Sequence, residues 1–355
     1  MLPDTAGCDT LIFDDRFADL WHMIGDTPMI KLCYRYNGKT SFIFVKCEQF
    51  NLTGSIKDRI ALYILQEAYK NGKLFPGYKI VEATSGNTGI SFAAIGRALG
   101  HKVQIIMPDW LSQERKDIVR SMGADITLVS KQQGGFGGSI QMAELLGKQQ
   151  TDIFLPRQFE NPLNTEAHEK TTGPEIWRQL LQYKVQPDAF IAGVGTGGTI
   201  MGIGRFLKQQ NRQIHVFPLE PAESPTLSTG YKIGSHRIQG ISDEFVPPIV
   251  QFDLLDQIVQ VHDGDAILMA QKLAAQLGMA VGISSGANLI GAIKIKEELG
   301  KNACVVTVFP DCNKKYLSTD LFRPEPERDH YLSLYVDFIG YQPLDKNYKR
   351  TNTPN

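Results

Sequence analysis

A lysine stands at the start of a predicted helix, in a position that favours nucleophilic chemistry. Residues 51–59 read Asn-Leu-Thr-Gly-Ser-Ile-Lys-Asp-Arg, and an apolar run with helical spacing follows. Residues 53–55 are turn and N-cap types, so Lys57 falls in the first helical turn. The partial positive charge at a helix N-terminus favours a neutral amine, which attacks carbonyl groups. Lys57 is therefore a candidate Schiff-base lysine, and the alternative is an exposed ion pair with Asp58.

A second polar segment has the features of a carboxylate site. Thr84-Ser85-Gly86-Asn87-Thr88-Gly89 lies between a predicted strand and a predicted helix. Backbone N–H groups and hydroxyls gather there at a helix N-terminus, where they bind anions. The alternative is a capped helix start with two turn glycines.

A third segment, Gly193-Val194-Gly195-Thr196-Gly197-Gly198-Thr199, also joins a strand to a helix. It satisfies the GxGxxG pattern, and Glu220 ends the next strand where a ribose-binding acid would stand, so a dinucleotide site is one interpretation. The threonine hydroxyls suit a terminal phosphate at least as well. Pyridoxal phosphate carries both a phosphate and an aldehyde, and would link this segment to Lys57, whereas a nicotinamide would leave the lysine segment unexplained.

Composition excludes several other classes of protein. The 355 residues are 42% hydrophobic and 21% charged with a net charge of -1, which suits two domains and offers no basic patch for nucleic acid. Five scattered cysteines without a CxxC pair predict a reducing compartment and no metal site. No apolar run reaches the roughly 18 residues of a membrane span, so we expect a cytoplasmic protein without a membrane partner.

Apolar strands and amphipathic helices alternate from about residue 79 to residue 309, which predicts α/β domains with mostly parallel sheets flanked by helices. We expect residues 1–20 to be an irregular arm and residues 132–139 to be a glycine-rich loop before a helix over 140–148. The predicted domains are a smaller mobile one over residues 46–155, a larger cofactor-binding one over 1–45 and 156–325, and a peripheral tail over 326–355.

Beyond these patterns, the chain resembles the cysteine synthase and cystathionine β-synthase group of fold-type II pyridoxal-phosphate enzymes, which share a tryptophan synthase β-like fold. The matching segments run in family order over about residues 20–322. They are Gly25-Asp26-Thr27-Pro28, residues 53–59, residues 84–89, Gln158-Phe159-Glu160-Asn161-Pro162, Thr171-Thr172-Gly173-Pro174-Glu175, residues 195–199, Gln239-Gly240-Ile241, Gly282-Ile283-Ser284-Ser285-Gly286-Ala287 and Tyr316-Leu317-Ser318-Thr319.

The resemblance implies a role for each matched residue. Lys57 would form the Schiff base with pyridoxal phosphate and move the Cα proton, and Asn87 would bind the ring hydroxyl. Cys312 aligns with the serine that usually faces the pyridine nitrogen, although a small buried cysteine is the alternative. The substrate carboxylate would be held by Thr84, Ser85, Gly86, Thr88 and Gln158, and the phosphate by Gly195, Thr196, Gly197, Gly198 and Thr199.

One departure from the family bears on the reaction. Asp243 and Glu244 stand where acetylserine-using synthases usually have small uncharged residues, whereas cystathionine β-synthases have an aromatic residue and an acid there. A carboxylate beside the reacting carbon would repel hydrosulfide but activate water, so Asp243 is a candidate general base. The alternative is a solvated acidic pair on a mobile loop.

The resemblance therefore predicts a homodimeric enzyme that acts on small amino acids. The expected activity is that of a cysteine synthase, which makes cysteine from an activated serine and sulfide. The alternatives are a cysteine lyase or serine sulfhydrase that exchanges hydrosulfide and water, and a cystathionine β-synthase-like enzyme. From other classes, a nicotinamide-dependent oxidoreductase and a non-catalytic homologue remain open.

Overall fold

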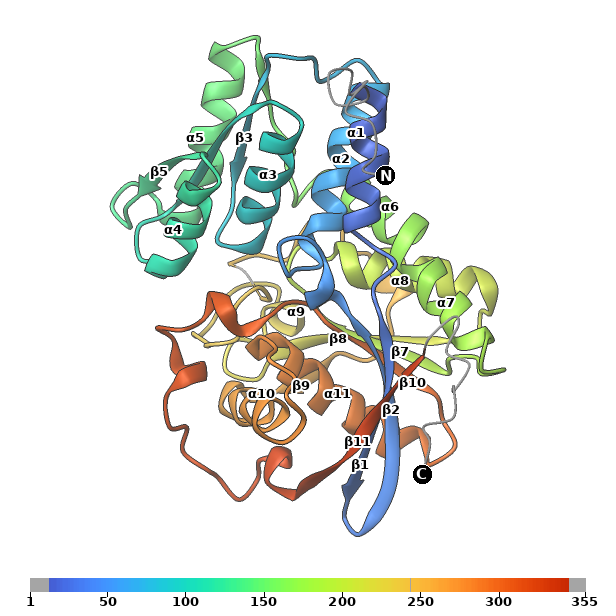
Figure 1. Cartoon of the computed structure of the whole chain (residues 1–355). Helices are drawn as coiled ribbons and strands as arrows, with labels where there is room; N and C mark the ends of the chain where they lie inside the picture. Colours follow the sequence, from blue (N-terminus) through green and yellow to red (C-terminus); the bar gives the residue numbers. More distant parts are fainter. Residues whose placement is uncertain (1–12, 243, 345–355) are drawn as a thin grey trace, which may run out of the picture. The chain divides into compact units, whose positions relative to one another are not determined.

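The computed structural model describes residues 13–242 and 244–344, and it shows the strand and helix alternation that the sequence predicts (Figure 1). Among these residues the chain divides into two compact units. Unit 1 comprises residues 13–25, 51–53 and 57–157, and unit 2 comprises residues 26–50, 54–56 and 158–344. Unit 1 thus holds most of the predicted smaller domain of residues 46–155, and it also includes residues 13–25.

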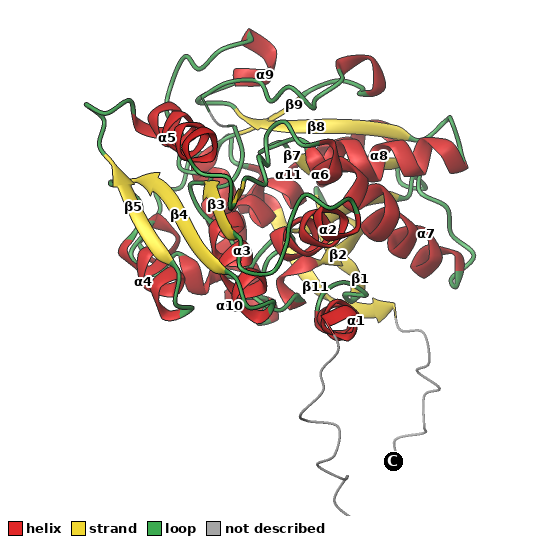
Figure 2. Ribbon diagram, turned by 90° about the horizontal axis from the view of Figure 1, so that it is seen from above, coloured by secondary structure: helices red, strands yellow, loops and turns green. Residues whose placement is uncertain are grey.

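Unit 1 is built on a parallel sheet with strand order β5-β4-β3-β6. Its elements are α1 (Phe13–Met23), α2 (Lys57–Lys70), β3 (Lys79–Ala83), α3 (Asn87–Ala98), β4 (Lys102–Pro108), α4 (Gln113–Ser121), β5 (Asp125–Val129), α5 (Gly135–Gln149) and β6 (Ile153–Phe154). Helix α5 covers one face of this sheet, and α3 and α4 cover the other (Figure 2). Both faces are therefore buried, as a parallel sheet requires.

Alternate residues of β3 explain how one strand serves both faces of this sheet. Val81 packs in a core cluster with Ala143 of α5. Ile80 points the other way, toward α3, because a methyl group placed on Gly96 of that helix would lie 3.0 Å from its Cδ1 atom. Gly96 therefore lets α3 approach the sheet closely.

Unit 2 contains a mixed sheet with strand order β11-β1-β2-β10-β7-β8-β9. The neighbours from β2 to β9 are parallel, and β1 pairs antiparallel with β2 and with β11. The strands are β1 (Met29–Tyr36), β2 (Lys39–Cys47), β7 (Ala189–Gly193), β8 (His215–Pro221), β9 (Val259–Val261), β10 (Val305–Phe309) and β11 (Val336–Leu344). The helices are α6 (Pro162–Ala167), α7 (Gly173–Leu181), α8 (Gly198–Gln210), α9 (Thr226–Thr229), α10 (Asp263–Leu277) and α11 (Ile283–Leu299).

Two apolar cores flank the mixed sheet. Ala189 and Ile191 of β7 pack in the cluster that contains residues of α10 and α11, while Phe190 and Ala192 pack in the cluster that contains residues of α7 and α8. This alternation follows from the two-residue period of side chains along a strand. Together the two sheets confirm the predicted α/β fold with mostly parallel strands.

Three segments differ from the sequence expectation. Within the arm expected over residues 1–20, the described part forms α1, whose Phe17 is buried and whose Trp21 Nε1 donates to Gln66 Oε1 at 3.0 Å. Helix α5 begins at Gly135, inside the glycine-rich stretch. The chain there folds so tightly that a methyl group on Gly138 would lie 2.1 Å from the Gln133 carbonyl oxygen. The glycines from Gly135 onward therefore belong to the first turn of α5, and not to a loop that precedes the helix.

The third difference concerns the segment expected to be a peripheral tail. Residues 336–344 form strand β11, which lies beside β1 at the edge of the mixed sheet (Figure 1). Leu332 and Val336 belong to the core cluster that α10 and α11 line. In the described part of the chain, no helix is both long enough and apolar enough to cross a bilayer.

Candidate active site

Lys57 is the first residue of α2, where the sequence predicts it, and its side chain is half-buried. The neighbouring Asp58 is fully buried. Its carboxylate accepts hydrogen bonds from the Thr53 N–H and Thr53 hydroxyl, each at 2.6 Å, and from the Ser91 hydroxyl at 2.6 Å. These bonds close the turn that precedes Lys57. The solvent-exposed ion pair considered from the sequence needs an exposed Asp58, so the structure does not support it.

The three residues before Lys57 belong to unit 2 and are held there by backbone bonds. Ser55 forms an antiparallel bridge with Asp311, the Ile56 N–H donates to the Pro310 carbonyl at 2.8 Å, and the Cys312 N–H donates to the Gly54 carbonyl at 3.1 Å. Gly54 has a φ of +76°, and a methyl group on it would lie 2.9 Å from the Cys312 Sγ atom. Only glycine therefore suits this position next to the cysteine.

The predicted carboxylate segment lies in unit 1, between β3 and α3. Thr84 and Thr88 are buried, while residues 85–87 are half-buried. Gly86 is the N-cap of α3, so no cap side chain occupies the helix N-terminus, and its N–H donates to the Thr84 hydroxyl at 3.3 Å. This arrangement suits a ligand carboxylate because it combines backbone donors with the positive end of the helix dipole.

Arg115 lies beside this segment, and the sequence analysis did not identify it. It is 5% exposed, its Nη1 lies 3.5 Å from the Ser85 carbonyl oxygen, and a methyl group on Gly86 would lie 3.4 Å from its Cζ atom. A buried guanidinium beside a helix N-terminus strengthens the attraction for an anion. Only the fold of α4 brings Arg115 next to Gly86, so no local spacing could have revealed it.

The predicted phosphate cup lies in unit 2, between β7 and α8. Gly197 is the N-cap of α8 in a left-handed conformation. A methyl group on Gly195 would lie 2.3 Å from the Gly240 carbonyl oxygen, and one on Gly198 would lie 1.9 Å from Asn164 Oδ1. Asn164 Nδ2 donates to the Thr196 hydroxyl at 2.9 Å. Side chains are thus excluded from a backbone cradle at a helix N-terminus, and such a cradle fits a phosphate.

The alternative dinucleotide site fails at Glu220. This carboxylate is fully buried and accepts hydrogen bonds from the Leu227 N–H at 2.7 Å, from the Gln260 Nε2 at 3.1 Å and from the Ser228 hydroxyl. A ribose-binding acid must present its oxygens to the ligand. Glu220 instead anchors α9 and β9.

Two residues of unit 2 are candidates to face a pyridine nitrogen. Cys312 is half-buried and has a free thiol, and its backbone forms an isolated antiparallel β-bridge with Val281. Ser285, in the first turn of α11, has a completely buried hydroxyl with no hydrogen-bond partner among the described residues. An unsatisfied buried hydroxyl is costly, and a bound cofactor can supply the missing hydrogen-bond partner. The only sequence signal for Ser285 was its place in the segment over residues 282–287.

The remaining predicted residues have mixed outcomes. Gln158 is buried, and its backbone carbonyl accepts from Asn164 Nδ2 at 2.7 Å. Asp243 lies outside the described residues. Glu244 is half exposed and lies 3.7 Å from the Lys232 ammonium group. Within the described residues, no group of three or more His, Cys, Asp or Glu side chains gathers as metal ligands would.

The candidate residues therefore fall into two sets, one in each unit. Unit 1 carries Lys57 and residues 84–88, which offer an amine and a carboxylate site. Unit 2 carries Gln158, the cup over residues 195–199, Cys312 and Ser285. The cradle and the orphaned serine hydroxyl fit the phosphate and the ring of pyridoxal phosphate.

Comparison with known proteins agrees with this chemistry. The family model described as pyridoxal-phosphate dependent enzyme matches residues 20–311. A cysteine synthase of Staphylococcus aureus is 41% identical over 304 residues, which cover 86% of this chain and 96% of that protein.

Two solved structures are similar to this chain over most of their length. A hydrogen sulfide-producing enzyme from Fusobacterium nucleatum is 53% identical with a TM-score of 0.89, over 92% of this chain and 97% of that one. A cysteine synthase from Entamoeba histolytica is 34% identical with a TM-score of 0.79, over 89% of this chain and 93% of that one. The Fusobacterium enzyme has also been solved as an aspartate-to-asparagine variant in complex with a reaction intermediate.

The chain belongs to the family of pyridoxal-phosphate dependent enzymes. Within that family its relatives are cysteine synthases and cysteine synthase-like enzymes of fold type II, as the motifs predict. It is an enzyme that uses pyridoxal phosphate and acts on small amino acids.

Proposed function

We propose that this enzyme releases hydrogen sulfide from L-cysteine by exchanging the thiol for water, with L-serine as the second product. The observation that carries the proposal is the similarity to the hydrogen sulfide-producing enzyme, at 53% identity and a TM-score of 0.89, against 41% identity to a cysteine synthase. The Asp243-Glu244 pair supports it, because an acid is suited to activating water and unsuited to accepting hydrosulfide.

The chain's own residues would divide the work as follows. Lys57 provides the amine that binds the cofactor and then moves the proton at Cα. The N-terminus of α3, with Thr84 and Thr88 and the neighbouring Arg115, binds the substrate carboxylate, and Gln158 is proposed to assist. The Gly195–Thr199 cup neutralises the phosphate. When bound, pyridoxal phosphate withdraws electrons from Cα and so makes its proton acidic.

Two further assignments complete the proposed site. Asn87 binds the ring hydroxyl, and either Cys312 or Ser285 faces the pyridine nitrogen. Neither a thiol nor a hydroxyl stabilises a positive ring nitrogen as a carboxylate would, which favours loss of a β-substituent over transamination. The two residues are distinguished by the absorbance spectra of C312A and S285A, because only the residue that faces the ring changes the cofactor band.

Asp243 is proposed as the general base that takes a proton from the water replacing the thiol. The reaction is balanced, since L-cysteine and water give L-serine and hydrogen sulfide. The test is to supply L-cysteine alone and measure sulfide and serine. We expect the two in equal amounts, and serine formation should fall about 100-fold in D243N, the lower end of the range for general-base catalysis.

Glu244 offers a matched control for that test, because its exposed carboxylate lies near Lys232 and its neutralisation in E244Q should leave the rate unchanged. Equal rates in D243N and the unaltered enzyme would refute the base assignment. Sulfide accompanied by pyruvate and ammonia, with no serine, would show elimination in place of exchange.

The second candidate is cysteine synthase activity, which the 41% identity over 86% of the chain favours. It predicts that O-acetylserine and sulfide give cysteine faster than cysteine gives sulfide. Supplying serine or O-acetylserine with homocysteine tests cystathionine formation in the same assay. Comparing the kcat/KM values of the three reactions decides among them.

We also propose that the enzyme is a cytoplasmic homodimer. Among the described residues Cys33, Cys47, Cys304 and Cys312 are free thiols, which suits a reducing compartment. Light scattering of the eluted protein should give twice the chain mass, and a mass equal to one chain would refute the dimer.

A further inference from the structure

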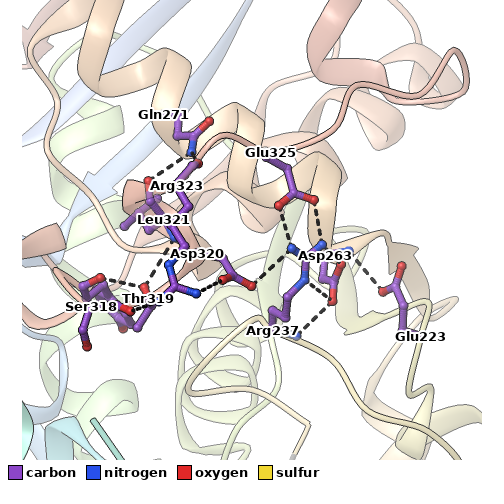
Figure 3. Close-up of polar contacts among 11 residues, drawn as sticks. Glu223, Arg237, Asp263, Gln271, Ser318, Thr319, Asp320, Leu321, Arg323 and Glu325 are labelled. Atoms are coloured by element: carbon purple, nitrogen blue, oxygen red, sulfur yellow. Dashed lines mark hydrogen bonds and ion pairs between the residues drawn. The ribbon is translucent and has the colours of Figure 1, made fainter. Parts of the chain in front are cut away.

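Arg237 is the centre of an ion-pair network in unit 2 that the proposed chemistry does not use (Figure 3). Its Nη2 lies 2.7 Å from Asp263 Oδ1 and 2.7 Å from Glu325 Oε1, and its Nη1 lies 2.6 Å from Glu325 Oε2. Nη1 is also 3.3 Å from Asp320 Oδ2. The guanidinium thus makes a bidentate contact with Glu325, which is the strongest geometry for an arginine–carboxylate pair. It also contacts the carboxylates of Asp263 and Asp320.

The carboxylates come from distant parts of the chain. Asp263 is the first residue of α10, Asp320 opens a short 3₁₀ turn over residues 320–322, and Glu325 lies in the proline-bearing stretch that follows. The family match ends at residue 311. Two of the three partners of Arg237 therefore lie beyond the part of the chain that the family model covers.

Glu325 occupies a site shaped for it. Its side chain is only 5% exposed. A methyl group on Gly264 would lie 2.6 Å from Glu325 Oε1 and 2.5 Å from the Tyr331 hydroxyl, so glycine at this position leaves room for both side chains. The hydrogen bonds that Arg237 donates to Glu325, and then those that it donates to Asp263, raise the pKa of Arg237. The Arg237 side chain is 38% exposed, so it is the buried Glu325 carboxylate that would be left without compensation if the pair were broken.

Hydrogen bonds of Arg237 and of its neighbour His236 fix the two ends of the segment over residues 236–242. Its N–H donates to Asp263 Oδ2 at 3.0 Å. His236 Nε2 lies 3.0 Å from the Ser242 carbonyl oxygen and so spans the segment over residues 236–242. Ser242 has a φ of +52°, which is strained for a residue with a side chain. Its N–H donates to the Val194 carbonyl at 2.8 Å, and its hydroxyl donates to the Ser224 carbonyl at 2.9 Å.

The same segment forms a wall of the phosphate cup. A methyl group on Gly195 would lie 2.3 Å from the Gly240 carbonyl oxygen, and one on Gly193 would lie 2.8 Å from the Ile241 side chain. The backbone over residues 240–242 is therefore in direct contact with the strand end and turn that form the cup. A small displacement of this segment changes the cup.

We propose that Arg237 is a positioning residue, and that Glu325 holds the segment over residues 236–242 against the phosphate cup through it. This inference rests on the proposed phosphate-binding role of residues 195–199. The stretch after Phe322 then serves cofactor binding from outside the family match.

The test compares E325Q with E327Q, because Glu327 is exposed in the same stretch and thus provides a matched control. Hydrogen exchange of the full-length holoenzyme and of the cofactor-free protein is followed by mass spectrometry. We expect faster exchange in E325Q over residues 236–242, where the Arg237 and Ser242 amides are bonded, and unchanged exchange in E327Q. Pyridoxal phosphate affinity should fall about tenfold in E325Q, as for loss of a charge-assisted bond, while kcat at saturating cofactor stays near its original value.

A second pair of variants covers the case in which E325Q folds poorly. Arg237→Lys keeps the positive charge but loses the bidentate hydrogen bonds, so it should retain more cofactor affinity than Arg237→Met, which loses both. Unchanged exchange over residues 236–242 in E325Q would overturn the proposal, as would equal effects of E325Q and E327Q. Hydrogen exchange in the cofactor-free protein does not depend on chemistry at Lys57. It therefore tests the role of Glu325 even if the proposed reaction is not the one that the enzyme catalyses.

Discussion

Replacement of Gly195 by alanine tests whether the backbone cradle binds the cofactor phosphate. The added methyl group would lie 2.3 Å from the Gly240 carbonyl oxygen. Ordinary contacts between carbon and oxygen begin at about 3.3 Å, so one of the two backbones must move by about 1 Å. Gly195 is not among the residues with positive φ, so the steric contact and not backbone strain causes the effect.

The expected loss follows from that displacement. A displacement of about 1 Å breaks a hydrogen bond to the charged phosphate, which is worth roughly 1.5–3 kcal/mol, and overpacking of this kind costs roughly 1–3 kcal/mol of stability. We therefore expect pyridoxal phosphate to bind G195A about 100-fold more weakly.

The assay is an absorbance titration of cofactor-free protein with pyridoxal phosphate, together with thermal unfolding of the same sample. G137A is the control, because no heavy atom lies within 4 Å of the methyl position on Gly137 in α5. Affinity of G195A equal to that of the unaltered protein would refute the cradle as the phosphate site. A weakened affinity in G137A as well would show that the loss is not specific.

Other predictions concern the supports of the site. D58N should lower the free energy of unfolding by about 1–3 kcal/mol, because an amide cannot accept all three hydrogen bonds that the buried carboxylate receives, and urea denaturation measures the change. A D58N protein as stable as the original would contradict this role. Burial lowers the pKa of His236, so the unfolded chain binds a proton first and stability falls as pH decreases below about 6.5. H236Q keeps a donor without the titration and should show a smaller loss of stability between pH 7.5 and 5.5, whereas an identical loss would exclude His236 as a cause.

Local patterns were sufficient for much of the fold. The apolar runs from β3 to β10 carry the period of a buried strand or of an amphipathic helix, and this period was enough to predict the alternation of strands and helices. The amine, the carboxylate segment and the cup were also visible locally, because each depends on a turn of polar and glycine residues next to a helix start. The residue types at these three places are determined by the local backbone geometry, so the sequence alone reveals them.

The parts that were missed depend on contacts between distant residues. Strand β11 contains a proline and alternates little in polarity, and only pairing with β1 makes it a strand. Arg115 reaches Gly86 through the packing of two helices. Glu325 lies 88 residues from Arg237 in the sequence, and nothing near either residue indicates the pair. Such contacts require the tertiary structure.

Borohydride reduction of the holoenzyme, followed by proteolysis and mass spectrometry, tests most directly that Lys57 carries the cofactor. We predict a reduced pyridoxyl group on the peptide that contains Lys57, and no such group in K57A. Lys46 is fully buried and already contacts Glu175, Gln179 and the Thr27 carbonyl, so it should remain unlabelled. A label on any other lysine, or a protein that binds pyridoxal phosphate without a reducible bond, would contradict the account.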